Sequence, residues 1–148
     1  MKQKQISKWD ERFLRLADFK ATWSKDPSTK VGCVITRGNR DIAHGYNGFP
    51  PRIEDTFERL NNYELRQMLM IHAELNAFIA AKQDLTGCTL YSTRPPCIRC
   101  AVIIIAVGIT RVVSYEHTPE KKKKHKAEYK LVKKLYKEAG IQYETYPF

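Results

Sequence analysis

The chain has 148 residues, about the length of one ordinary domain. Hydrophobic residues make up 43% and charged residues 28%, a globular mixture that excludes disorder, a collagen-like repeat or low complexity for the chain as a whole. The formal net charge is +10, from 26 Lys and Arg against 16 Asp and Glu. This excess indicates an anionic partner such as a nucleic acid, a nucleotide or a membrane surface.

The distribution of apolar residues argues against a membrane location. The longest apolar run, 101–107, is far shorter than the roughly 18 residues of a transmembrane helix. The start, 1–5, is polar and charged and leads into an amphipathic segment, unlike a secretory signal. We therefore expect a cytoplasmic protein, in which the four cysteines bind metal or are buried and do not form a disulfide framework.

The first half of the chain predicts a helix, then a β-hairpin, then a long irregular or partly helical segment. Apolar residues at helical spacing define the helix, and β-branched residues on one side of a Gly-Asn turn define the first strand of the hairpin. Two consecutive prolines follow the second strand and cannot extend its ladder. The predicted helix covers residues 7–26, the strands cover 31–36 and 42–46, and the irregular segment covers 47–71.

The second half alternates helices and strands. Gly and Pro separate segments of helix formers from segments of β-branched residues. The order predicts one α/β domain, residues 1–148, with a partly parallel, mixed sheet of about five strands covered by helices on its faces. The predicted helices cover residues 72–82, 97–107 and 120–139, and the strands cover 88–92, part of 109–115, and 141–146.

Two of the predicted helices begin with side chains that bind metals. His72 opens one helix, and Cys97 and Cys100 lie three residues apart at the start of another, so both sulfurs share one face of its first turn. Two thiolates and one imidazole suit zinc. Three protein ligands leave the fourth tetrahedral position for water, which is the pattern of a catalytic site.

Glu74 is expected to move protons and not to bind the metal. It would be a hard oxygen donor beside three softer ones, and it is two residues from His72. An H-x-E sequence followed by P-C-x-x-C is the pattern of the zinc nucleobase deaminases. The alternatives are a redox-active CxxC or a structural zinc site. The structural site would need a fourth ligand from Cys33 or Cys88, which we expect to be buried thiols, or from His44, His117 or His125.

Two further segments accompany the zinc motif, SKDPSTKVG at 24–32 and GYNGFP at 45–50, and the zinc helix itself reads HAELNA at 72–77. Together with the zinc motif, these segments resemble the deoxycytidylate (dCMP) deaminase family of the cytidine deaminase-like superfamily, and the resemblance covers most of residues 7–115. The zinc motif is shared by many deaminases, and the GYNGFP segment narrows the choice. The resemblance implies a three-layer α/β/α sandwich.

The same resemblance implies a reaction and a set of contacts. The reaction is the zinc-dependent hydrolysis of dCMP to dUMP and ammonia, which supplies dUMP for thymidylate synthesis, with Glu74 carrying the proton. Asn47 is expected to bind the sugar. Ser24, Lys25 and the loop after Tyr115 are expected to bind the 5′-phosphate. Gly45 and Gly48 are expected to serve the turn or to let the backbone approach a ligand.

Many members of this family, including a phage type, are allosteric hexamers. The resemblance therefore implies activation by dCTP and inhibition by dTTP with Mg²⁺. Tyr46, Gly48, Asn76 and Lys82 are the candidate contacts for these effectors. It further implies a homo-oligomer with no membrane partner and no obligatory nucleic acid, located in the cytoplasm, or in the host cytoplasm for a phage-encoded member.

Two other functions compete with this one. A deaminase acting on a polymer, either tRNA adenosine or single-stranded DNA cytosine, would use the same zinc site, and the basic charge would suit phosphate contacts. A non-enzymatic zinc-binding module is the second. Residues 119–139 contain nine Lys and three Glu, a net of +6 out of +10. We expect this run, including 121–126, to be mainly a solvated helix face that also attracts anions.

Overall fold

The computed structural model describes residues 4–148, so residues 1–3 at the polar start lie outside the described residues. A five-stranded sheet in the order β2-β1-β3-β4-β5 forms its centre. β1 pairs antiparallel with β2 and with β3, whereas β3, β4 and β5 run parallel. The strands are β1 (Gly32–Arg37), β2 (Arg40–Tyr46), β3 (Thr89–Ser92), β4 (Arg111–Tyr115) and β5 (Gln142–Tyr146).

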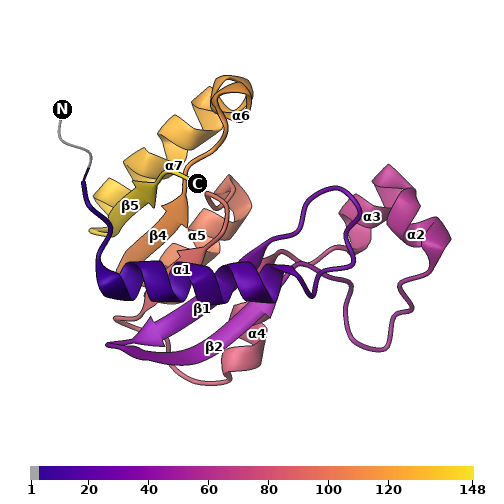
Figure 1. Cartoon of the computed structure of the whole chain (residues 1–148), viewed down its shortest axis with the longest axis horizontal. Coiled ribbons are helices and arrows are strands. Elements are labelled where there is room, and N and C mark those ends of the chain that lie inside the picture. Colours follow the sequence, from indigo (N-terminus) through magenta and orange to yellow (C-terminus); the bar gives the residue numbers. More distant parts are fainter. Residues whose placement is uncertain (1–3) are drawn as a thin grey trace.

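Helices cover both faces of this sheet, as Figure 1 shows. They are α1 (Lys8–Ala21), α2 (Phe57–Asn61), α3 (Tyr63–Leu69), α4 (Ala73–Ala81), α5 (Ile98–Ala106), α6 (Pro119–Lys124) and α7 (Lys126–Glu138). The mixed sheet and its helical layers confirm the predicted α/β sandwich. No helix within residues 4–148 has the length and apolar composition that crossing a membrane requires.

The alternation of side chains along the strands separates two hydrophobic cores. Val34, Tyr91 and Val113 point to one face and pack against Phe13, Leu14 and Ala17 of α1. Their neighbours in sequence point to the other face and pack against α4, α5 and α7. The second core includes Cys33 and Cys88, which are fully buried, as predicted for inert thiols.

Gly45 allows α4 to pack directly on β2. A Cβ atom at Gly45 would lie 2.5 Å from the Ala73 carbonyl oxygen and 2.5 Å from the Ala77 nitrogen, far inside contact distance. The close approach that the sequence indicated at Gly45 is therefore an approach to a helix and not to a ligand. It fixes the start of α4 at the edge of the sheet where β2, β3 and β4 end and β1 begins.

The structure agrees with one predicted segment, the irregular or partly helical stretch over 47–71, and differs from another. The irregular stretch contains two short helices, α2 and α3, which project away from the sandwich in Figure 1. The single Lys-rich helix predicted over 120–139 is two helices that meet at His125, where the backbone has φ −107° and ψ 22°. Helix propensity alone gives no signal for this break, because Lys and Glu favour helix on both sides of it.

Candidate active site

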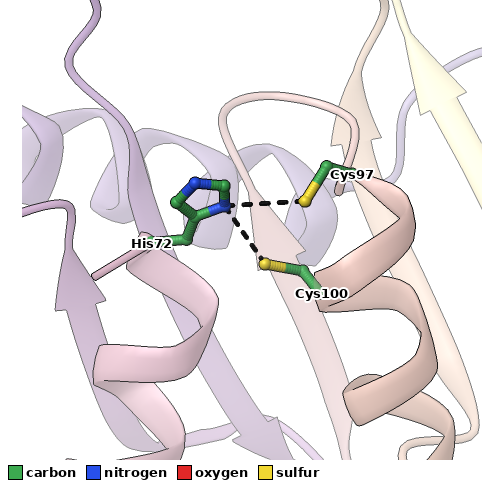
Figure 2. Close-up of side chains that lie close together, drawn as sticks. All are labelled: His72, Cys97 and Cys100. Carbon is green, nitrogen blue, oxygen red and sulfur yellow. Dashed lines mark hydrogen bonds between the residues drawn. The ribbon is translucent and has the colours of Figure 1, made fainter. Parts of the chain in front are cut away.

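The three predicted metal ligands meet between the first turns of α4 and α5. His72 is the N-cap of α4, Cys97 is the N-cap of α5, and Cys100 lies in the first turn of α5. The His72 Nδ1 atom is 3.6 Å from the Cys97 Sγ and 3.3 Å from the Cys100 Sγ, and Figure 2 shows both sulfurs facing this nitrogen. Neither N-cap side chain caps its own helix.

These distances fit a tetrahedral zinc ion. With Zn–S bonds of about 2.3 Å and a Zn–N bond of about 2.0–2.1 Å, nitrogen and sulfur ligands lie roughly 3.5 Å apart. The three donor atoms all lie within 4.8 Å of one another, and they are the only such His/Cys/Asp/Glu group found in residues 4–148. A structural site would need a fourth ligand, and the described residues offer none to this group.

The electrostatics of the cluster act in opposite directions on its two thiols. The Cys100 thiol and the His72 ring lower the pKa of Cys97 to about 4, although burial opposes this shift. The neighbouring Cys97 sulfur and burial raise the pKa of Cys100. These shifts favour the thiolate form of Cys97 and the protonated form of Cys100. Zinc requires both as thiolates, so binding would release that proton.

Glu74 lies beside the cluster in the first turn of α4. Its side chain is 4% exposed, and the Ser92 hydroxyl at the end of β3 donates to Glu74 Oε1 at 3.2 Å. Burial raises the pKa of the Glu74 carboxyl. A buried carboxyl held beside a metal site is placed to accept a proton from one group and donate it to another.

A cavity of about 250 Å³ opens onto these residues. His72, Glu74 and Cys97 form part of its wall, and Gln67 and Met70 contribute from α3 and the residue that follows it. Four basic or titratable side chains also line it: Arg94, His117, Lys121 and His125. Burial and the charges of His125, Lys121 and Arg94 lower the pKa of His117, as expected where cationic groups converge.

Asn47 lines this cavity, but its amide is already held by the protein. Its Oδ1 accepts from the Val31 N–H at 2.8 Å, and its Nδ2 donates to the Thr29 carbonyl at 2.8 Å and to Asp26 Oδ2 at 3.4 Å. These bonds fix the segment that precedes β1. One lone pair on Oδ1 stays available to a ligand.

The other predicted substrate contacts lie outside the residues that line this cavity. Ser24 is buried and its hydroxyl donates to the Asn47 carbonyl at 2.8 Å, so it supports the loop. Lys25 is exposed and pairs with Asp55 at 2.7 Å. Tyr115 donates to Asp18 at 2.7 Å, on the α1 side of the sheet. The loop after Tyr115, however, carries His117 into the cavity.

The four candidate effector residues fall in two places. Tyr46 and Gly48 line a second hollow of about 130 Å³, together with Lys25. Asn76 donates to the Tyr46 carbonyl at 2.8 Å, and so ties α4 to the end of β2. Lys82 is the C-cap of α4, at the opposite end of that helix from His72.

The four side chains Arg94, His117, Lys121 and His125, called the basic wall below, are the part of the site that the sequence did not predict. Arg94 lies two residues after the end of β3, and Lys121 begins a lysine run that the sequence predicts to be a solvated face. The prediction is correct for Lys122, Lys123 and Lys124, which are exposed, and it is wrong for Lys121. The only signal was the loop after Tyr115, which the resemblance had associated with phosphate.

Comparisons with known proteins agree with this geometry. Residues 7–116 match the family model described as the cytidine and deoxycytidylate deaminase zinc-binding region. The chain is 37% identical over 142 residues to an "uncharacterized deaminase in luxG 3′region" of Aliivibrio fischeri, with 96% of each chain covered. It is 33% identical over 157 residues to a probable deoxycytidylate deaminase of Drosophila melanogaster, with 98% of this chain and 75% of the relative covered.

A solved structure has the same fold. The dCMP deaminase of cyanophage S-TIM5, in complex with dCMP and dUMP, superimposes with a TM-score of 0.74 at 19% identity, over 96% of this chain and 99% of that one. At that identity the likeness concerns the fold alone. Because the family model spans the zinc ligands and most of the chain, this protein belongs to the zinc-dependent cytidine and deoxycytidylate deaminase family.

Proposed function

We propose that the protein hydrolyses dCMP to dUMP and ammonia. The observation that carries this proposal is a single cavity lined by two of the three zinc ligands, His72 and Cys97, by Glu74, and by the basic wall of Arg94, His117, Lys121 and His125. The first group suits hydrolysis of an aromatic amine, and the second suits the phosphate of a mononucleotide. Relatives of the chain include a probable deoxycytidylate deaminase of Drosophila melanogaster and the deoxycytidylate deaminase of Saccharomyces cerevisiae.

The phosphate is assigned to the basic wall. A phosphate dianion can accept hydrogen bonds from Arg94 and Lys121, which are charged at neutral pH, and from the two histidine rings. His117 Nδ1 is buried and has no hydrogen-bond partner within residues 4–148. A buried unpartnered nitrogen is costly, and a ligand oxygen would satisfy it. Ser24, Lys25 and Tyr115 then act on this site through the loops that they hold.

The remaining residues orient the sugar and the base. Asn47 can accept a hydrogen bond from a sugar hydroxyl through its unused Oδ1 lone pair, while its other bonds keep the amide in one orientation. A zinc ion held by His72, Cys97 and Cys100 would lower the pKa of water toward neutrality beside the base.

Glu74 moves the protons of the reaction. Its carboxylate takes a proton from the attacking water and gives it to the ring nitrogen N3, and a further proton reaches the departing amine. The C4–O bond forms, the C4–N bond breaks, and ammonia leaves. The Ser92 hydroxyl keeps the carboxylate oriented throughout.

A substrate panel tests this function. Zinc-loaded protein is mixed with dCMP, deoxycytidine, CMP and dCTP, and the loss of the cytosine absorbance is followed. We expect dCMP to give the highest kcat/KM and deoxycytidine to be at least tenfold poorer, because it lacks the phosphate. Turnover of tRNA or single-stranded DNA without turnover of dCMP would favour the polymer deaminase instead and overturn the proposal.

Regulation belongs to the same proposal. The hollow beside Tyr46 and Gly48 borders Lys25. A nucleotide bound there would contact Tyr46, whose carbonyl accepts a hydrogen bond from Asn76 on the helix that carries Glu74. We assign dCTP as activator and dTTP with Mg²⁺ as inhibitor to this place, with Lys82 as an outer contact. The assembly is proposed to be a hexamer that supplies dUMP for thymidylate synthesis in the cytoplasm.

Two measurements separate regulation from catalysis. Light scattering after size exclusion gives the oligomer number, and thermal unfolding with millimolar dTTP and Mg²⁺ reports binding. We expect stabilisation by dTTP and Mg²⁺ that Tyr46→Ala reduces. An unchanged midpoint in the unmodified protein at millimolar dTTP would contradict effector binding while leaving dCMP hydrolysis intact.

A further inference from the structure

Glu128 lies in the first turn of α7, and its carboxylate contacts one residue of α5 and the residue that precedes α7. Its Oε1 accepts a hydrogen bond from the Ile98 backbone N–H at 2.9 Å. Its Oε2 lies 3.6 Å from Nδ1 of His125, which lines the substrate cavity. The carboxylate therefore joins the start of α5 to the basic wall of the site.

The contact with Ile98 replaces a missing helix cap. Helices normally begin with a residue whose side chain accepts a hydrogen bond from one of the first N–H groups. The N-cap of α5 is Cys97, which makes no such bond, because its sulfur faces His72. Glu128 supplies the acceptor from another helix, and its negative charge suits the positive end of the α5 dipole.

The position of this bond matters because α5 carries two of the three metal ligands. Ile98 lies between Cys97 and Cys100 in the same helical turn, so an unpaired N–H or a frayed first turn there would move both sulfurs. Residues that hold metal ligands in place without binding the metal are important in many proteins. Removing such a residue commonly lowers metal affinity or activity by about 10- to 100-fold.

We propose that Glu128 is a positioning residue that holds the sulfur ligands in place by capping α5 from α7. The ordinary alternative is that Glu128 is only an acid in the first turn of its own helix, where it stabilises α7. Glu120 lies in the first turn of α6 and is exposed, and within residues 4–148 it makes no hydrogen bond to α5. It therefore provides the matched control.

The test measures zinc release and does not depend on the identity of the substrate. Zinc-loaded variants are mixed with a coloured chelator, and the release rate is followed. We expect Glu128→Ala to release zinc at least tenfold faster than the unchanged protein, and Glu120→Ala to release it at the unchanged rate. Glu128→Gln keeps an acceptor for the Ile98 N–H and should restore slow release.

Cobalt substitution gives a second readout. The thiolate-to-cobalt absorption bands report the geometry of the two sulfur ligands, so Glu128→Ala should shift or weaken them, while Glu128→Gln should not. If Glu128→Ala does not fold, Ile98→Pro decides instead. It removes the same N–H at the first helical position, which tolerates proline, and should release zinc at least tenfold faster.

Three results would overturn the proposal. The first is a Glu128→Ala release rate and cobalt spectrum within twofold of the unchanged protein. The second is Glu128→Gln releasing zinc as fast as Glu128→Ala, since charge and not capping would then matter. The third, if Glu128→Ala does not fold, is slow release from Ile98→Pro. If the unchanged protein does not turn over dCMP, the proposed function is contradicted, but the proposed role of Glu128 in holding the sulfur ligands is not.

Discussion

The Ser92 hydroxyl donates a hydrogen bond to Glu74 Oε1 across 3.2 Å, and both side chains are almost fully buried. This contact joins the end of β3 to the first turn of α4. It fixes the carboxylate beside the cluster of His72, Cys97 and Cys100 without using any of the metal ligands. Ser92 therefore orients the proton carrier from the sheet, while Glu74 also interacts with the Cys100 thiol.

Glu74→Gln should abolish most activity without removing zinc. The amide is close in shape to the carboxylate but cannot carry a proton, so we expect kcat for dCMP to fall by about 10²–10⁴-fold. Ser92→Ala should lower kcat by about tenfold, because the carboxylate loses one orienting bond. Zinc content and initial rates check both variants. Loss of zinc from Glu74→Gln would show that the carboxylate supports the metal site instead.

Lys121→Ala should weaken dCMP binding. Removing one charge-assisted hydrogen bond to the phosphate costs about 1.5–3 kcal/mol, so KM for dCMP should rise by about 10- to 100-fold. Turnover of deoxycytidine, which has no phosphate, should change little. Lys123→Ala is the control, because Lys123 is exposed and does not line the cavity. Equal effects of Lys121→Ala on dCMP and deoxycytidine would contradict the phosphate assignment.

Asp10 should control acid stability. Burial raises its pKa, but hydrogen bonds from Arg111 and Tyr91 outweigh burial and hold the pKa below the ordinary 3.8. A carboxyl with a lowered pKa stabilises the fold fully above about pH 4, and this stability is lost as the pH falls below 3.8 toward the folded-state pKa.

Asp10→Asn should therefore lower the free energy of unfolding at pH 7 by about 3 kcal/mol, because Arg111 loses a buried partner. The difference from the unchanged protein should shrink below pH 3.8, where Asp10 itself becomes protonated. Denaturant unfolding at pH 7 and at pH 3 measures both. Asp41→Asn, at an exposed position, should change stability by less than about 0.5 kcal/mol at pH 7.

Gly45→Ala should separate α4 from β2. The added Cβ would lie 2.5 Å from backbone atoms of α4, and backbone cannot rotate away as a side chain can. We expect a loss of about 1–3 kcal/mol in unfolding free energy and faster zinc release, because α4 carries His72. Gly48→Ala is the stability control, because a Cβ atom at Gly48 would lie 3.8 Å from the nearest atom, in the Tyr46 ring, at ordinary contact distance. Equal stability of the two variants would contradict this role of Gly45.

Local patterns predicted most of the fold. Apolar spacing predicted α1, and Pro and Gly marked the boundaries of the strands, because these signals depend only on neighbours in sequence. The break at His125 gave no such signal. The helix that begins after the break packs against α5, which precedes it by about twenty residues in the sequence.

The sequence by itself determined the chemistry of the metal site. His72, Cys97 and Cys100 are the right ligand types at helix starts, and Glu74 has the right spacing, so their roles followed from coordination preferences. Only the tertiary structure decided what surrounds them. The Asn47 amide is turned toward the segment that precedes β1, Lys121 lines the cavity, and Glu128 caps α5. Those orientations arise when separate elements pack together, and no local spacing in the chain encodes them.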